Sequence, residues 1–494
     1  MIGTGENRCD GLFLLKKPVE ILYFTCLRVF PFKPVCLKTR DTESFCHRHG
    51  SVFMDDLTPR EIVSELDKFI IGQNEAKNAV AIAIRNRWRR LQLSREMQEE
   101  VTPKNIIMIG PTGVGKTEIA RRLAQMIDAP FIKVEASKYT EVGYHGRDVE
   151  SMIRDLTKTA FTMVYRRLQK EYEEEAKDAA DRRVVDCLIP SAESSEGEDV
   201  RQTKEKFLSL VRDGELDDRE VEITVQQQSS PYNVEVFSNA GLEEMGVDFQ
   251  QMFDRISPKQ SSAKRTTVKD ARKALFSEEL EKLIDESAVS EEAVDKVQNS
   301  GMIFIDELDK IATGSSESKN IDVSRAGVQR DLLPIVEGST VWTRYGMIRT
   351  DHILFVAAGA FHSSKPSDLI PELQGRFPIR VELNSLKKED FKAILTTPKN
   401  ALIKQYKALL ATDSVALDVD ESAIDEIADF CVRINEKTQD IGARRLHTIM
   451  EKVLEKISFE APERAGERVE IDKQHIRESL EELAGDEEVS RYIL

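Results

Sequence analysis

Apolar residues recur at helical intervals soon after residue 57, and the first predicted helix has a clear beginning. Thr58-Pro-Arg-Glu61 has the form of a capping box with proline at the first helical position. Ile62, Leu66 and Phe69-Ile70 follow at intervals of three or four residues, which predicts an amphipathic helix. The segment Ile70-Ile-Gly-Gln73 should end this helix, because glycine interrupts the helical pattern.

A second helix is predicted from about residue 74 to residue 93, and its two sides differ in polarity. One side is an apolar stripe, and the other carries arginines that would face either solvent or an acidic neighbour. The stripe consists of Val80, Ile84, Trp88 and Leu91, and the basic side consists of Arg85, Arg87, Arg89 and Arg90.

Short apolar runs further along the chain predict buried strands that alternate with helices. These runs occupy residues 105–109, 131–134, 302–305 and 353–357. Helices are predicted over residues 118–127 and 323–337, a hairpin over 340–349, and almost continuous helix from residue 387 onward. The order indicates an α/β domain followed by a smaller helical domain.

The loop between the first strand and its helix has the phosphate-binding pattern G-x-x-x-x-G-K-[ST], as Gly110-Pro-Thr-Gly-Val-Gly-Lys-Thr117. Its glycines let the backbone wrap closely around a phosphate, and the helix N-terminus adds positive potential. Lys116 would reach the β- and γ-phosphates, and the Thr117 hydroxyl would ligate Mg²⁺. The predicted nucleotide-binding residues of the loop are Gly113, Val114, Gly115, Lys116 and Thr117.

An acidic pair follows the strand Met302-Ile-Phe-Ile305, as Asp306-Glu307. This order is typical of a Walker B motif, in which Asp306 would hold Mg²⁺ through water and Glu307 would polarise the attacking water. Such a pair is common by chance after an apolar strand, but it becomes strong evidence beside a phosphate-binding loop. The sequence therefore predicts a site that hydrolyses a nucleotide.

The two motifs are separated by far more sequence than one or two β-α units need, so a segment is inserted between them. It should begin near residue 164 within a long charged helix and pass through an acidic linker over residues 191–199. Residues 221–225 alternate like a strand, and helices are predicted over 267–286 and 290–299. The insert is therefore expected to be mostly helical.

Composition narrows the possible partners. The chain has 494 residues, of which 40% are hydrophobic and 32% charged, and its formal net charge is −17. Such acidity argues against general binding of nucleic acid. No apolar run reaches the roughly 18 residues that a membrane-spanning helix needs, so we expect no membrane contact and a cytoplasmic location.

Residues 1–53 differ from the rest, because they hold four of the six cysteines: Cys9, Cys26, Cys36 and Cys46. Their spacing lacks the close cysteine pair of a zinc site, and the segment lacks the order of a signal peptide. An organelle-targeting segment stays open as an alternative. We favour an atypical, disordered extension upstream of a native start at Met54.

A phosphate-binding loop, an acidic pair and a trailing helical domain together resemble the AAA+ ATPases. That resemblance gives catalytic roles to Glu307 and to two arginines. Arg376, in Glu372-Leu-Gln-Gly-Arg-Phe377, stands where an arginine finger that reaches the neighbouring subunit belongs. Arg444, in Gly442-Ala-Arg-Arg-Leu446, stands where the sensor arginine of the small domain belongs. Outside this context, a surface ion pair would be the better interpretation of either arginine.

From Met54 onward the chain resembles one family more closely, HslU (also called ClpY), the unfoldases of the HslUV protease. The resemblance rests on several segments that are specific when taken together. They are Thr58-Pro-Arg-Glu-Ile-Val-Ser-Glu-Leu66, Ile70-Ile-Gly-Gln73, Arg85-Asn-Arg-Trp-Arg-Arg90, Val101-Thr-Pro-Lys-Asn105, Glu141-Val-Gly-Tyr-His-Gly146, Gly327-Val-Gln-Arg-Asp-Leu-Leu-Pro334 and Ser490-Arg-Tyr-Ile-Leu494.

The resemblance implies an α/β P-loop AAA+ core over residues 54–163 and 300–384. It also implies an inserted, mostly helical intermediate domain over 164–299 and a C-terminal helical small domain over 385–494. ATP and Mg²⁺ are the implied ligands. The implied partners are further copies in a homohexamer, unfolded protein substrates and a dodecameric HslV-type peptidase. Proteolysis would belong to that partner, because no H-E-x-x-H or G-x-S-x-G motif occurs in this chain.

The resemblance also assigns binding roles to individual residues. Ile70 and Ile71 would pack on adenine, although simple interdomain packing is the alternative. Tyr144 would grip substrate in the axial channel, from a loop in which Gly143 and Gly146 permit movement. The family pattern there is Gly-Tyr-Val-Gly, whereas this chain has His145 in place of valine, which would make the grip more polar and pH-sensitive.

The tail would dock between peptidase subunits and activate them, through Arg491, Tyr492, Ile493 and Leu494. A frayed terminus is the alternative. No residue is assigned as the γ-phosphate sensor, because Ala357-Ala-Gly-Ala-Phe361 lacks the usual Asn or Thr.

Three other functions fit less well. ClpX would bring a zinc-binding N-terminal domain with paired cysteines and an Ile-Gly-Phe docking loop, and neither is present. A DNA-translocating motor would need basic surfaces that face nucleic acid. An ATP-dependent chaperone or scaffold that acts without a peptidase stays open.

Overall fold

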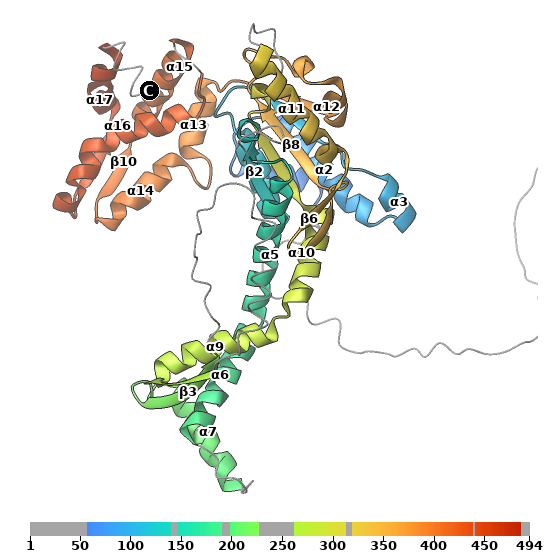
Figure 1. Ribbon diagram of the computed structural model, residues 1–494. Helices are drawn as coiled ribbons and strands as arrows, with labels where there is room; N and C mark the ends of the chain where they lie inside the picture. Colours follow the sequence, from blue (N-terminus) through green and yellow to red (C-terminus); the bar gives the residue numbers. More distant parts are fainter. Residues whose placement is uncertain are drawn as a thin grey trace, which may run out of the picture. The chain divides into compact units, whose positions relative to one another are not determined.

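A five-stranded parallel sheet carries the phosphate-binding-loop motif and the acidic pair, with strand order β2-β5-β8-β1-β9. Two of its strands, β2 and β8, are labelled in Figure 1. Because parallel strands present their carboxyl ends at one edge, the loop after β1 and the acidic end of β5 come together there, on either side of β8. The strands are β1 (Ile106–Ile109), β2 (Phe131–Glu135), β5 (Met302–Asp306), β8 (Leu354–Gly359) and β9 (Ile379–Glu382).

The structure is a computed structural model, and it describes six stretches of the chain. They are residues 57–139, 147–189, 198–226, 261–312, 319–437 and 440–485.

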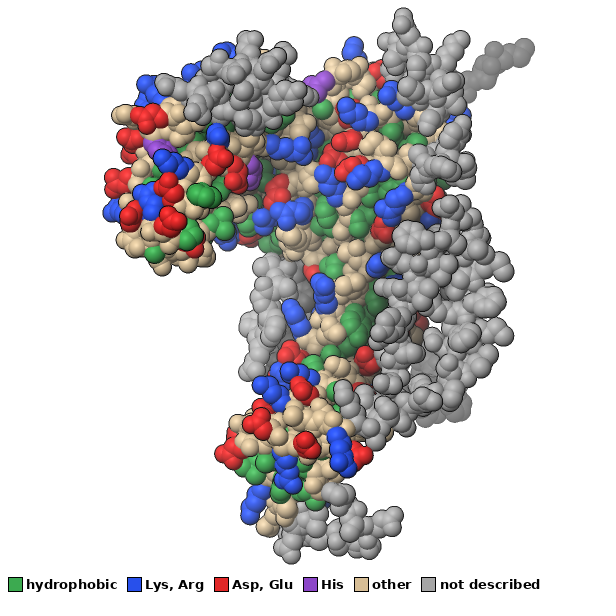
Figure 2. All heavy atoms as spheres, turned by 60° about the vertical axis from the view of Figure 1, so that its left-hand side comes forward, with side chains coloured by type: hydrophobic (Ala, Val, Ile, Leu, Met, Phe, Trp, Pro, Cys, Tyr) green, Lys and Arg blue, Asp and Glu red, His purple; other side chains and the backbone are tan. Residues whose placement is uncertain are grey.

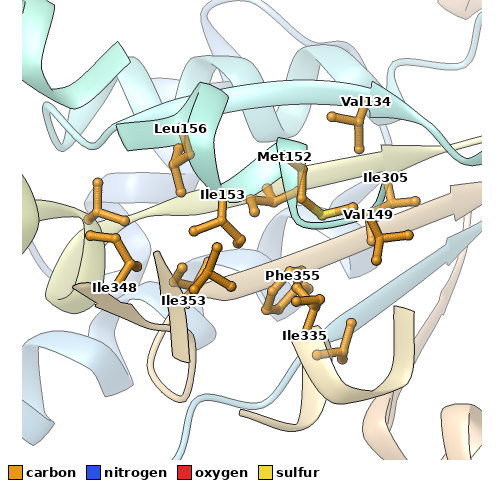
Figure 3. Packing of buried hydrophobic residues seen from close by; sticks show 14 of the residues in the cluster. Val134, Val149, Met152, Ile153, Leu156, Ile305, Ile335, Ile348, Ile353 and Phe355 are labelled. Atoms are coloured by element: carbon orange, nitrogen blue, oxygen red, sulfur yellow. The ribbon is translucent and has the colours of Figure 1, made fainter. Parts of the chain in front are cut away.

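Alternating side chains give the sheet two apolar faces. Ile305 and Phe355 point to one face, where they pack with Met152 of α5 and Ile335 of α11 (Figure 3). Residues of α10 belong to the same cluster. Met108 and Phe304 point to the other face, against α1, α2 and α4. The helices on these faces are α1 (Pro59–Asp67), α2 (Asn74–Leu91), α4 (Lys116–Met126), α5 (Ser151–Glu171), α10 (Glu286–Ser300) and α11 (Lys319–Glu337).

Thr58 caps α1, and the predicted capping box is present, because Glu61 accepts from the Thr58 amide while the Thr58 side chain accepts from the Glu61 amide. In α2, Val80 and Ile84 are buried as predicted, but Leu91 is exposed. The apolar stripe therefore ends about one turn earlier than the sequence pattern indicated.

The prediction of a solvated or acid-facing side of α2 is wrong for two of its arginines, although Arg89 is exposed as predicted. Arg87 and Arg90 are buried. The Arg87 guanidinium donates to the backbone carbonyls of residues 299–301 and of His352, at 2.8–3.2 Å. Three of these carbonyls lie at the C-terminal end of α10, where helical carbonyls lack partners within the helix. Arg87 thus caps a helix, which amphipathic patterning alone does not reveal.

The segment between β2 and β5 contains a second apolar core. The long helices α5 and α10 lie side by side (Figure 1) and lead to it, and their contact includes a bidentate ion pair of Arg167 with Glu292 at 2.6–2.7 Å. Val184, Ile223 and Leu275 are buried in this core. Its elements are α6 (Glu173–Leu188), α7 (Glu198–Arg212), β3 (Glu220–Gln226), β4 (Ser261–Thr267) and α9 (Val268–Leu283), with β3 and β4 antiparallel.

The C-terminal part has a third core of its own, around Phe391, Ile427 and Leu446. Its helices are α13 (Lys388–Thr396), α14 (Leu402–Thr412), α15 (Glu421–Lys437), α16 (Arg444–Glu460) and α17 (Lys473–Gly485). The sequence pattern missed a short parallel sheet here, formed by β10 (Ala416–Val419) and β11 (Arg468–Ile471).

A predicted hairpin is present over residues 340–349. Its strands, β6 (Thr340–Thr343) and β7 (Gly346–Arg349), pair antiparallel. The remaining helices are α3 (Arg95–Glu100) and α12 (Pro371–Arg376), and the short 3-10 turns are η1 (Ala136–Lys138), η2 (Leu308–Lys310), η3 (Pro366–Asp368) and η4 (Ala461–Arg464).

The surface seen in Figure 2 mixes acidic and basic side chains across the described residues. Among the described helices, none is long and apolar enough to cross a bilayer.

Candidate nucleotide-binding and hydrolysis site

A cleft of about 990 Å³ lies at the carboxyl edge of the sheet, and most of the predicted nucleotide-site residues line it. The phosphate-binding loop, the acidic pair at the end of β5 and the start of α16 all contribute to its wall. Residues predicted for the site that line this cleft are Ile70, Ile71, Gly113, Val114, Gly115, Lys116, Thr117, Asp306, Glu307 and Arg444.

The phosphate-binding loop lies unusually close to the C-terminal part. A Cβ atom on Gly113 would come within 2.1 Å of the Ile441 carbonyl oxygen, and Gly113 has a positive φ of 77°. On the other side, a Cβ on Gly442 would lie 2.7 Å from the Thr112 carbonyl oxygen. The Ala443 amide donates to the Gly113 carbonyl at 3.1 Å. Glycine is therefore required on both sides of this contact.

Lys116 is the first residue of α4, and its side chain is buried under the loop. Its ammonium donates to the carbonyls of Gly110 and Pro111, at 2.6 and 2.7 Å. Burial lowers the pKa of Lys116, while the nearby carboxylates of Asp306 and Asp309 oppose that shift. The ammonium is thus held at the loop, where an anionic ligand would replace part of its lost hydration.

The acidic pair is held in a defined geometry at the end of β5. Asp306 Oδ1 accepts from the Glu307 amide at 3.0 Å. Glu307 has a positive φ of 57°, which a residue with a side chain rarely adopts. Ser137, which follows β2, donates from Oγ to Glu307 Oε2 at 2.9 Å. This combination fixes where the Glu307 carboxylate lies before any ligand binds.

Two charged residues that sequence reasoning did not single out lie near this pair or near Lys116. Lys133 of β2 pairs with Asp306, with Nζ and Oδ2 2.7 Å apart. Asp309, in η2, lines the cleft close enough to Lys116 to affect its pKa. Lys133 could have been noticed in the sequence, because it is a charged residue within the otherwise apolar start of β2. In the structure, β2 lies next to the strand that carries Asp306.

The loop after β8 supplies polar groups where no sensor residue had been assigned. Beyond Ala357–Gly359, the cleft is lined by Ala360, His362, Ser363 and Ser364. Ser364 Oγ donates to the Asp309 carbonyl at 3.3 Å. Polar side chains therefore line this part of the cleft, but they follow the segment 357–361 in which a γ-phosphate sensor was sought.

Apolar side chains from two parts of the chain also line the cleft. Ile70 is buried and lies against Gly115, while Ile71 is half-buried. Leu386 and Ile394 line the same cleft from the start of the C-terminal part. An apolar wall of this kind suits the flat face of a purine base.

Arg444 lies at the first turn of α16 and is close enough to Lys116 to lower its pKa. Arg376 behaves differently, because it is absent from the cleft wall of its own chain. It ends α12 and forms an ion pair with Glu337. The structure thus brings Arg444 to the cleft but leaves Arg376 outside it.

Two groups of predicted site residues lie outside the described residues. These are the loop residues Gly143, Tyr144, His145 and Gly146, and the tail residues Arg491, Tyr492, Ile493 and Leu494.

The donor set of the cleft fits a hard divalent cation. Thr117 offers a hydroxyl and Asp306 a carboxylate, both at the cleft wall, and oxygen donors of this kind are what Mg²⁺ prefers. Few protein ligands are typical of Mg²⁺, which keeps several waters and binds through nucleotide phosphates.

Comparisons with known proteins agree with this geometry. A family model described as ATPase family associated with various cellular activities (AAA) matches residues 106–225, and one described as AAA domain (Cdc48 subfamily) matches residues 220–380.

Full-length relatives match over most of the chain. An ATP-dependent protease ATPase subunit HslU from Persephonella marina is 54% identical over 446 residues, which are 89% of this chain and 99% of that protein. Proteins of the same name from Desulfotalea psychrophila and Magnetococcus marinus are 54% and 50% identical, cover 89% of this chain each, and are themselves covered over 99% and 100% of their length.

Proposed function

Because the chain belongs to the HslU family of ATP-dependent protease ATPase subunits, we propose that it uses ATP hydrolysis to unfold proteins and feed them to a separate peptidase. The chain is an AAA+ ATPase. One observation carries the proposal furthest: Lys116, Thr117, Asp306, Glu307 and Arg444 line a single cleft.

In this proposal, the residues of the cleft divide the work of phosphoryl transfer. Water adds to the γ-phosphorus, the bond from that phosphorus to the ADP oxygen breaks, and the proton that the water loses passes to the phosphate product or to solvent. Glu307 orients and polarises that water, while Lys116 and Arg444 neutralise charge that develops on the phosphates. Bound Mg²⁺, held by Thr117 and through water by Asp306, would add Lewis-acid stabilisation of the same charge.

We further propose that the site is completed by a neighbouring copy in a homohexamer. Arg376 lies outside the cleft of its own chain, which suits a finger that reaches the next subunit. A ring would also place Tyr144 of each copy at a common channel, where an aromatic side chain grips an unfolded chain without sequence preference. The proposed partner is an HslV-type peptidase, a dodecamer. The proposed location of the chain is the cytoplasm.

The test is peptide hydrolysis by an HslV-type peptidase in the presence of ATP. The full chain is compared with a variant that lacks Tyr492–Leu494. We expect strong stimulation by the full chain and none by the variant, although both should hydrolyse ATP. Stimulation that survives the deletion would contradict the assigned role of the tail.

A full chain that hydrolyses ATP without stimulating the peptidase would favour the alternative, a chaperone or remodelling ATPase that acts alone. Repeating the measurement with a chain that starts at Met54 separates that outcome from interference by residues 1–53. A Tyr144→Ala variant then tests the channel, since it should block degradation of folded substrates while leaving small peptides unaffected.

A further inference from the structure

Lys133 contacts the acidic pair from outside the nucleotide cleft. Its Nζ lies 2.7 Å from Asp306 Oδ2, and it is not among the residues that line the cleft. Asp306 Oδ1 already accepts from the Glu307 amide at 3.0 Å. Each oxygen of the Asp306 carboxylate therefore has a protein donor, one of which is a full positive charge.

Strand register explains how the lysine reaches this position. In the β2–β5 pair, Glu135 is opposite Asp306, so Lys133 lies two residues before the direct partner. Residues two apart on a strand share a face, so Lys133 and Asp306 project from the same side of the sheet. Diagonal neighbours on adjacent strands are within reach of a long side chain.

The pair is partly screened from solvent, because the Lys133 side chain is 36% exposed and that of Asp306 only 20%. Glu135, the nearest carboxylate on β2, is occupied by Lys138 at 3.0 Å. Lys133 is thus directed to Asp306 rather than shared between two acids.

We propose that Lys133 is a positioning residue of the nucleotide site. Its ammonium orients the Asp306 carboxylate and partly neutralises it, and so it limits how strongly the site prefers Mg²⁺-bound over Mg²⁺-free nucleotide. The inference rests on the proposed role of Asp306 toward Mg²⁺.

The physical argument concerns charge. An unpaired Asp306 would present a full negative charge beside the phosphates, which repels nucleotide without a metal and attracts the metal. A fixed ammonium on Oδ2 reduces both effects. It also spares Lys116, which would otherwise carry the counter-charge for Asp306 alone, since Asp306 is the carboxylate with the largest effect on that lysine.

The experiment measures the affinity of the full chain for a fluorescent ADP analogue, once in excess Mg²⁺ and once in EDTA. The quantity compared between variants is the affinity in Mg²⁺ divided by the affinity in EDTA. In Lys133→Met this ratio should rise by about two- to fivefold, the range expected for a partly exposed ion pair. Lys133→Gln should behave alike, and Lys133→Arg should restore the ratio of the unmodified chain.

Lys138→Met is the matched control, because it removes a neighbouring lysine whose partner is Glu135. Its ratio should not change. A purely structural role for Lys133 would weaken binding by the same factor in Mg²⁺ and in EDTA and leave the ratio constant.

A ratio that is unchanged or lower in both neutral variants, while the unmodified chain binds normally, overturns the proposal. Loss of nucleotide binding by the unmodified chain would instead contradict the nucleotide site itself. The melting temperature of each variant shows whether any change in affinity stems from unfolding. A neutral variant that melts early but keeps a raised ratio still supports the proposal.

Discussion

At the scale of single residues, the backbone of Glu307 is the clearest sign of a functional constraint. Its φ of 57° is costly for a residue with a Cβ atom, by about 1–2 kcal/mol. The Asp306 carboxylate and the Ser137 hydroxyl hold it there by hydrogen bonds. The residue that carries this strain lies at the wall of the cleft.

Replacing Glu307 with glutamine should therefore separate binding from hydrolysis. We expect ATP hydrolysis to fall by about 10²- to 10³-fold, because an amide polarises water poorly. Nucleotide affinity, measured with the fluorescent ADP analogue, should stay close to that of the unmodified chain. A parallel loss of affinity would show that Glu307 acts through the shape of the cleft instead.

His352 should make stability depend on pH. Burial, aided by nearby Arg90, lowers its pKa from 6.5 to about 4, and its Nδ1 has no hydrogen-bond partner among the described residues. Between pH 6.5 and about pH 4, this histidine is protonated in the unfolded chain but neutral in the folded chain. Stability is therefore lost as the pH falls through this window, by about 1–2 kcal/mol because the ring is only half-buried.

The check is the fall in melting temperature between pH 7.5 and pH 5. In His352→Gln that fall should be smaller than in the unmodified chain. An equal fall in both proteins would show that His352 does not cause the pH dependence.

The site residues differ in how far sequence could predict them. Two short motifs could be predicted, because the residues of each are consecutive in the chain and the local backbone places their side chains. These motifs contain Lys116, Thr117, Asp306 and Glu307. Lys133 pairs with Asp306 on the neighbouring strand, and Ser137, which follows β2, donates to Glu307. The lysine is visible as a charge within an apolar strand, but the spacing of residues does not fix which strands are neighbours. The roles of Arg376, Tyr144 and the tail remain predictions.

At the scale of elements, the contact between the phosphate-binding loop and the residues before α16 deserves a direct test. The Ala443 amide to Gly113 carbonyl hydrogen bond, at 3.1 Å, joins the loop to the C-terminal part. Any change that separates them would also move Arg444, the residue after Ala443, away from the phosphate-binding loop.

Gly442→Ala should weaken nucleotide binding by about tenfold or more, because its Cβ atom would lie 2.7 Å from the Thr112 carbonyl oxygen and push the loop away. Gly466→Ala is the matched control. It has a positive φ too, 89° against 55°, but no atom lies within 4 Å of the added Cβ. It should cost about 1 kcal/mol of stability and leave affinity unchanged.

Element prediction succeeded where a pattern is local. The capping box at Thr58 and the hairpin over residues 340–349 are present as predicted. Element prediction failed where the environment of a residue depends on a part of the chain that is distant in sequence. Arg87 is buried because α10 ends beside it, and β10 pairs with a strand that follows two helices later. Helical spacing carries no information on either.

At the scale of the whole molecule, the proposed ring predicts complementation between two inactive variants. Arg376→Ala and Glu307→Gln should each lose ATP hydrolysis. In an equal mixture of subunits, about a quarter of the interfaces would join an intact Glu307 to an intact Arg376 of the neighbour. Hydrolysis by the mixture should therefore exceed that of either variant alone.

The mixture is made by exchanging subunits under conditions in which rings dissociate, and hydrolysis is measured after reassembly. Each variant taken through the same procedure alone is the control. A mixture no more active than its parts would mean that Arg376 serves its own subunit, or that no ring forms; light scattering distinguishes these two.

The pairing of α5 with α10 also bears on how this architecture arose. The chain leaves the sheet along one helix and returns along its neighbour, and the segment between them has its own apolar core. Joining the two helices by a short turn would leave the order of the five strands unchanged. A single insertion or deletion between α5 and α10 could therefore add or remove this segment without changing the sheet. The length of the segment could likewise change while the residues of the cleft stay in place.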